Sequence, residues 1–227
     1  MKILSLHRRS LAGQHLPLTR RFSARRLLRN GALGLLLFLG LVILVWQVIT
    51  VSQSMSDFCQ DYFAGRYVLQ GLSAYLPVHC WAGYTRIPAP IEYDAHPPFS
   101  VLLTLPLSLL PRLSATLLWG FFCLASYLAA GWLLLKELGW HTLAKVTLFV
   151  LASALWPPLR LAEDMQNSAQ LLLLLLVAAW VLERRGHSTW AGVLIGLAGL
   201  LKVWPAALLL GALLLRRWPL ARSGALT

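Results

Sequence analysis

The chain has 227 residues, of which 58% are hydrophobic and only 12% are charged, and its mean hydropathy is +0.68. Soluble domains carry about 25% charged residues, so this composition cannot cover a water-facing surface and indicates an all-α integral membrane protein. The formal net charge is +12, but the basic residues concentrate in an acid-free arm before residue 30, which argues against nucleic acid as a partner and indicates membrane lipids.

The arm and the segment after it set the predicted orientation. Residues 1–30 are basic and directly precede the uncharged segment 31–51. By the positive-inside rule the arm lies in the cytoplasm. Segment 31–51 is long enough to cross a hydrocarbon core of about 30 Å as a helix. The loop over 52–99 is therefore expected outside the cytoplasm.

The loop begins with a predicted helix that carries two carboxylates. Ser56 is a suitable N-cap, and the pattern predicts a helix over 57–70 that stops at Gly71. Asp57 and Asp61 are four residues apart, so they share one face of this helix.

Other residues of the loop helix suggest its surroundings. Phe58, Tyr62 and Leu69 fall roughly on a second face, as expected for a helix that lies along the membrane interface. Cys59 and Cys80 can form a disulfide, because an extracytoplasmic loop is an oxidising environment.

The remaining apolar segments predict about six crossings in a transmembrane domain over 31–217, followed by a C-terminal tail over 218–227. Segment 99–111 is short and contains Pro106, which favours a re-entrant or interfacial helix. The later crossings are then 113–135, 146–159, 171–182, 190–201 and 203–215. This topology places the following basic residues in the cytoplasm: Lys136, Lys145, Arg184, Arg185, Arg216 and Arg217. A full crossing by 99–111 would place the arginine pairs outside, against the positive-inside rule.

The same topology gathers polar residues on the extracytoplasmic face. They are Asp57, Asp61, His96, Glu163, Asp164, Gln166, Asn167 and Lys202. Lys202 stands between two apolar runs, where a charge is costly. It either extends to the membrane surface or has a carboxylate or phosphate partner.

An ordered set of short motifs resembles glycosyltransferase family 87. The set comprises Asp57-Phe58, Tyr62-Phe63-Ala64-Gly65-Arg66, Leu69-Gln70-Gly71, Tyr75, His96-Pro97-Pro98-Phe99, Leu105-Pro106-Leu107, Leu110-Pro111, Gln166-Asn167, Gly192, Gly196-Leu197-Ala198 and Leu201-Lys202 with Pro205. The resemblance implies a polytopic GT-C enzyme that moves a sugar, typically mannose, from a polyprenyl phosphate to a lipid or glycan acceptor with inversion.

The resemblance also implies roles for individual residues. Asp57 would be the general base that deprotonates the acceptor hydroxyl; its alternative role is to stabilise a helix N-terminus. Asp61 would assist, orient the acceptor or face water. Gln166 and Asn167 would bond sugar hydroxyls or satisfy backbone groups at a helix end.

The departing phosphate requires cations, and the ones available on this membrane face are Arg66, His96 and Lys202. His96 precedes two prolines, so a purely architectural role in the loop is the alternative. Metal-using GT-C enzymes have separated acidic residues, and these resemble Asp57, Glu163 and Asp164 of this sequence. A donor with a single phosphate nevertheless leads us to expect no metal and no other cofactor.

Two departures from the family pattern shape the remaining expectations. The approach to Asn167 reads Asp164-Met165-Gln166, where the family usually has Gly-Gln. The sequence also ends at Thr227, a little past half of the usual family length. We therefore expect an N-terminal portion that works with a C-terminal half or a partner subunit. The competing hypothesis is a non-catalytic membrane subunit or transporter fragment that binds polyprenyl lipid.

Overall fold

The computed structural model describes residues 24–51, 57–77, 96–156, 159 and 168–227. Within these ranges the chain forms helices and no strand, which confirms the all-α prediction. The elements, in chain order, are α1 (Ala24–Val51), α2 (Asp57–Leu69), α3 (Pro98–Thr104), the 3-10 turn η1 (Leu107–Leu109), α4 (Arg112–Glu137), α5 (Leu143–Leu155), α7 (Ala169–Arg184), α8 (Ser188–Leu201), the 3-10 turn η2 (Trp204–Ala206), α9 (Ala207–Leu214) and α10 (Trp218–Ala225).

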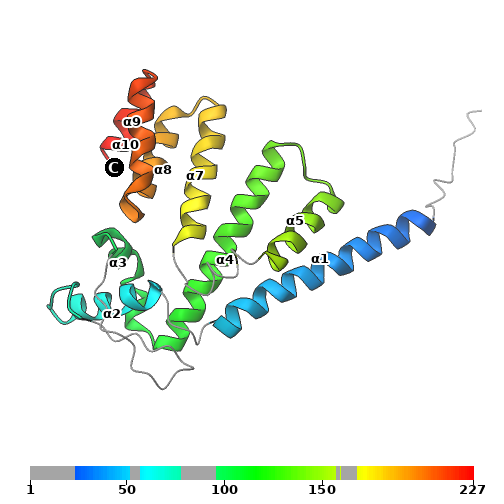
Figure 1. Cartoon of the computed structure of the whole chain (residues 1–227), viewed down its shortest axis with the longest axis horizontal. Coiled ribbons are helices and arrows are strands. Elements are labelled where there is room, and N and C mark those ends of the chain that lie inside the picture. The colour runs from blue at the N-terminus through cyan, green and yellow to red at the C-terminus, as the bar shows by residue number, and fades with distance from the viewer. Residues whose placement is uncertain (1–23, 52–56, 78–95, 157–158, 160–167) are drawn as a thin grey trace, which may run out of the picture.

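Helix α4 lies at the centre of the arrangement (Figure 1). The pair α1 and α5 packs together on one side of it, and α7 packs against it on the other. Helices α8 to α10 continue from α7, while α2 and α3 lie near the N-terminal end of α4. The fold is thus a set of packed apolar helices with a short helical layer at one end.

Among the described residues, two helices are long and apolar enough to cross a membrane. They are residues Arg25–Thr50 of α1 and Arg112–Glu137, the whole of α4. Their positions match the predicted segments 31–51 and 113–135. In α1 only 17% of the most apolar window is buried inside the protein, against 44% in α4. Helix α1 therefore presents apolar side chains outward, as a helix that faces lipid would.

The predicted count of six crossings is not confirmed. Helices α5, α8 and α9 have 13, 14 and 8 residues, whereas a perpendicular crossing needs about 20. Two features of the sequence keep them short. Pro157 and Pro158 follow α5 closely, and proline disfavours the continuation of a helix. Lys202 has an extended backbone, with φ −143° and ψ 131°, and separates α8 from η2 and α9.

Two segments outside the predicted crossings, 99–111 and 218–227, are also helical. Segment 99–111 contains most of α3 and all of η1, with Pro106 between them, so the expected short helix is present but is divided into two pieces. Its depth in a membrane stays a prediction. Segment 218–227, expected as a tail, instead contains α10, which packs along α8.

Glycines allow α8 and α10 to approach each other closely. A Cβ atom on Gly192 would collide with the Ser223 hydroxyl and the Leu220 carbonyl oxygen. One on Gly196 would lie 2.6 Å from the carbonyl oxygen of Gly224. The two glycines are four residues apart, and this spacing of small residues is typical of close contacts between membrane helices.

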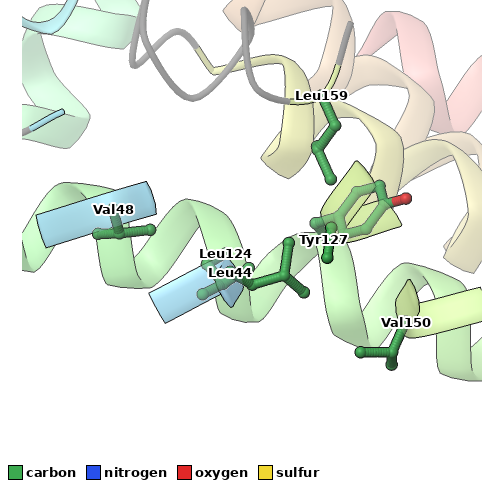
Figure 2. Packing of buried hydrophobic residues seen from close by; sticks show 7 residues of the cluster. Leu44, Val48, Leu124, Tyr127, Val150 and Leu159 are labelled. Atoms are coloured by element: carbon green, nitrogen blue, oxygen red, sulfur yellow. The ribbon is translucent and has the colours of Figure 1, made fainter. Parts of the chain in front are cut away.

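A buried cluster joins α1, α4 and α5. Figure 2 shows its side chains: Leu44, Val48, Leu124, Tyr127, Val150 and Leu159. Two hydrogen bonds accompany the apolar contacts. The hydroxyls of Tyr127 and Ser153 are 2.8 Å apart, and the side-chain amide of Gln47 donates to the Ala154 carbonyl at 3.0 Å. These directional bonds, one between α4 and α5 and one between α1 and α5, help to fix how the three apolar helices lie along one another.

Helix α2 is held against η1 and the start of α4 by side chains and by one glycine. The Tyr62 hydroxyl donates to the Leu110 carbonyl at 2.9 Å, and the Ser108 hydroxyl donates to the Tyr62 carbonyl at 3.0 Å. A Cβ atom on Gly65 would collide with the Ser108 hydroxyl and lie 3.1 Å from Ser108 Cβ. Helix α2 ends before Gly71, whose φ of +74° favours glycine.

The structure changes the interpretation of the apolar face of α2. Phe58 and Tyr62 are almost completely buried in the protein, and the Phe58 ring stacks on Trp119 of α4 at 5.5 Å. Leu69 is exposed. The face predicted to lie along the membrane interface is therefore mostly a protein contact, because α4 supplies the apolar surface that Phe58 and Tyr62 need.

Replacing Gly65 with alanine should lower the free energy of unfolding by about 1–3 kcal/mol, because the added methyl group meets Ser108 across a closely packed contact. Unfolding of the detergent-solubilised protein in a denaturant series measures the change. The matched control is Gly31→Ala in α1, whose added Cβ meets nothing within 4 Å. That variant should be unchanged or up to about 1 kcal/mol more stable. Equal effects of the two substitutions would contradict the close contact.

Candidate functional site

The first turns of α2 place two carboxylates on one face. Asp57 is the first residue of the helix and Asp61 lies one turn later, as the sequence predicted. Their surroundings differ. The Asp57 side chain is 27% exposed, whereas that of Asp61 is 6% exposed. One carboxylate is thus accessible from outside and the other is enclosed.

His96 lies against both carboxylates. Its Nδ1 atom is 3.1 Å from Oδ1 of Asp61, and its Nε2 atom is 3.8 Å from Oδ2 of Asp57. The backbone before α3 sets this position, since Pro97 is extended with φ −59° and ψ 150° and Pro98 begins the helix. Proline suits the first helical position because its missing N–H would have had no partner there.

Ser100 completes the contact around Asp61, and the sequence analysis missed it. Its hydroxyl is 3.1 Å from Oδ1 of Asp61 and 2.8 Å from the Pro97 carbonyl oxygen. Ser100 is 3% exposed. A single serine in the apolar run of α3 carries no signal of its own. The only pattern that could have found it is its position one helical turn after His96.

The cluster strongly favours the charged form of the His96 ring. The Asp57 and Asp61 carboxylates raise the pKa of His96 from 6.5 to about 10, against the opposing effects of burial and of the positive charge of Lys202. The ring is therefore an imidazolium at neutral pH, with a proton on each nitrogen. Nδ1 donates to Asp61, whereas Nε2 forms an ion pair with Asp57 at 3.8 Å.

Lys202 comes to the same region from the opposite end of the sequence. It follows the last residue of α8, is half-buried, and is among the charges that act on His96. Helices α3 and α8 are in contact. The structure thus brings Asp57, Asp61 and His96 together, and the charge of Lys202 acts on this charged cluster from the end of α8. Their shared membrane face stays a prediction.

Arg66 lies elsewhere on α2. Its Nη1 atom donates to the Tyr62 hydroxyl at 3.2 Å, and its guanidinium lies 5.9 Å from the centre of the Tyr62 ring. Arg66 therefore packs beside the Tyr62 side chain that anchors α2 on Leu110, and these contacts do not involve the carboxylates. Its expected role in binding substrate stays a prediction.

Several residues of the expected site lie outside the part of the chain that the structure describes. They are Cys80, Glu163, Asp164, Gln166 and Asn167. Cys59 is disulfide-bonded, as a Cys59–Cys80 bridge requires of it. Among the described residues no group of three His, Cys, Asp or Glu side chains is arranged to hold a metal ion. The expectation that the protein uses no metal is not tested by this.

A comparison with family models finds glycosyltransferase family 87 over residues 95–227. The match begins one residue before His96, includes Ser100 and Lys202, and starts after Asp57 and Asp61. Neither the curated proteins nor the solved structures contain a match to this chain. Since the family model covers more than half of the sequence, the chain belongs to glycosyltransferase family 87, whose members are membrane glycosyltransferases.

Proposed function

We propose that this protein transfers a hexosyl group, mannosyl in the first instance, from a polyprenyl-phosphate carrier to a lipid or glycan acceptor at the extracytoplasmic face. Asp57 acts as the general base. The observation that carries the proposal is the charged cluster, in which an accessible carboxylate stands beside a half-buried imidazolium on which the charge of Lys202 also acts.

The reaction that fits this cluster is a single inverting displacement. The acceptor hydroxyl oxygen attacks the anomeric carbon of the donor while its proton passes to the Asp57 carboxylate. The bond between the anomeric carbon and the phosphate oxygen breaks, and its electron pair leaves with the polyprenyl phosphate. The donor carries its own leaving group, so the proposal includes no cofactor or metal.

Asp57 is a better candidate for the base than Asp61. A base must reach the proton that it removes, and the Asp57 side chain is the more exposed of the two carboxylates. Oδ1 of Asp61 already contacts both the His96 ring and the Ser100 hydroxyl. Asp61 is therefore committed to neighbouring side chains, whereas an acceptor can approach Asp57.

His96 and Lys202 are the cations that we assign to the phosphate. Negative charge grows on the phosphate oxygens as the bond to the sugar breaks, and fixed cations in a partly buried site stabilise it. The two carboxylates alone would repel such a donor. The imidazolium and the ammonium offset them, so the cluster can accept a phosphate without a large net negative charge.

The charges at the other end of α4 support the proposed orientation. Glu137 ends α4 and pairs with Arg185 at 2.9 Å and with Arg184 at 3.8 Å, and Glu183 pairs with Arg217 at 3.0 Å. Helix α4 has 26 residues, so this end lies about 39 Å along the axis from the α2 end. By the positive-inside rule the arginine end is cytoplasmic and the Asp57 cluster is extracytoplasmic. A multi-pass topology with about six crossings is part of the proposal.

Replacing Asp57 with asparagine should lower the transfer rate at least 100-fold, because the amide cannot accept the acceptor proton. Membranes containing the protein, polyprenyl-phosphate [¹⁴C]mannose and a lipid-extract acceptor pool provide the assay. Glu137→Gln is the matched control: it removes one carboxylate at the opposite end of α4 and should retain most of the activity. Donor binding without transfer by the wild-type protein would instead favour a non-catalytic lipid-binding subunit.

The stability of the protein should depend on pH through His96. Its pKa in the folded protein, about 10, is above the ordinary value of 6.5. The charged ring therefore contributes stability that is complete below pH 6.5 and is lost as the pH rises through 10. The unfolding temperature of the wild type should exceed that of His96→Gln at pH 6, and the difference should shrink towards pH 10.5. A difference that stays constant across this range would contradict the proposed pairing, since other titrating groups are common to both proteins.

A further inference from the structure

The enclosed side of the cluster contains a polar pair that the proposed reaction does not use. Asp61 is 4% exposed and Ser100 is 3% exposed, and their side-chain oxygens are 3.1 Å apart. A carboxylate buried to this extent is costly unless hydrogen bonds and a counter-charge compensate it. Its compensation comes from the Ser100 hydroxyl and the His96 ring, which identifies these three side chains as one unit.

We propose that Asp61 and Ser100 are positioning residues for His96, which hold the Nδ1 edge of the ring so that its Nε2 edge faces the catalytic carboxylate of Asp57. This inference rests on the proposed function of Asp57 and changes the expected role of Asp61. Its carboxylate serves His96 and does not bind substrate.

The geometry of the imidazole ring explains how a contact at Nδ1 can orient Nε2. The two nitrogens lie on different edges of one rigid ring, so fixing one of them fixes the direction of the other. Asp61 contacts Nδ1 at 3.1 Å, and this contact leaves Nε2 directed towards Oδ2 of Asp57 at 3.8 Å. A partner on the far nitrogen that orients a working histidine is a general device in metal sites and catalytic triads.

Ser100 joins the two helices that supply the cluster. Its hydroxyl proton is shared between Oδ1 of Asp61 on α2 and the carbonyl of Pro97, next to His96. Asp61 is the charged acceptor, and hydrogen bonds to an ionised group are the stronger ones. Ser100 thereby holds the Asp61 carboxylate next to the turn before α3 that positions the His96 ring.

The charges around His96 keep its ring protonated near neutral pH, so the property that Asp61 and Ser100 control there is the orientation of the ring. The titratable groups that act on it are Asp57 and Asp61 from α2 and Lys202 from the end of α8. With a pKa of about 10, the ring keeps its proton throughout the neutral range. It works as a fixed cation beside Asp57, so a small rotation would separate it from the carboxylate and from an incoming phosphate.

Transfer kinetics of two variants test the positioning. Ser100→Ala should lower kcat about 10-fold, and Asp61→Asn by more, with KM for the donor within about 3-fold of the wild type. The matched control is Ser153→Ala. Like Ser100, Ser153 is a buried serine that contacts a side chain of another helix, the Tyr127 hydroxyl at 2.8 Å, and donates to a carbonyl of its own preceding turn, that of Phe149. It lies on α5, outside the cluster. This control should be destabilised to a similar extent and should keep kcat within 2-fold.

A second measurement does not depend on activity. In protein labelled with ¹⁵N-histidine, the His96 resonances are identified by their absence in His96→Gln and are followed through a pH titration. The titration midpoint should fall by at least one pH unit in Asp61→Asn and move measurably in Ser100→Ala, but stay unchanged in Ser153→Ala. If the wild type transfers no sugar, the proposed reaction fails while this titration still decides the positioning.

Two results would overturn the inference. One is a kcat in both Ser100→Ala and Asp61→Asn within 2-fold of the wild type, or an equal loss in Ser153→Ala. The other is a His96 titration that is the same in the wild type and in Asp61→Asn.

Discussion

The contact of α2 with η1 is the constraint on which the candidate site depends. Gly65 allows the backbone of α2 to lie directly against Ser108, and the hydrogen bonds of Tyr62 with Leu110 and Ser108 fix the helix along its axis. The carboxylates occupy the turns just before this contact, and His96 precedes the helix that leads into η1. A shift of α2 by one turn would move Asp61 by about 5.4 Å, which is enough to separate it from the ring.

The distribution of charge along α4 connects the fold with membrane orientation. At one end lie two carboxylates with an imidazolium and a lysine, and at the other end three arginines pair with Glu137 and Glu183. Pairs of this kind at an exposed surface contribute little stability each. Their importance here is positional, since they gather the ends of α4, α7 and α9 on one side. The apolar length of α4 then keeps the two groups of charges apart.

The sequence was sufficient to predict the features that follow from apolar length, charge and helix-stop signals. It predicted the helices that became α1 and α4, the helix over 57–70 and the gathering of Asp57, Asp61, His96 and Lys202. It could not find Ser100, because a serine within an apolar helix most often bonds a carbonyl of its own preceding turn, as Thr104 does here. It also missed α10. The spacing of Gly192 and Gly196 predicts a close helix contact but does not identify the partner, and α10, Trp218–Ala225, is too short for a periodic pattern to reveal it.

The family match covers the residues that anchor α2 but not α2 itself, and this division shows how the candidate site is built. The matched residues begin at 95 and so include His96, Ser100 and Lys202, while both carboxylates precede them. The residues that hold α2 in place, Ser108, Leu110 and Trp119, are all within the match. The matched region therefore provides the cations together with the surface on which the acidic helix rests. Since a base is useful only at a fixed distance from the bond that it helps to break, the packing of α2 on this surface belongs to the candidate site as much as the charged residues do.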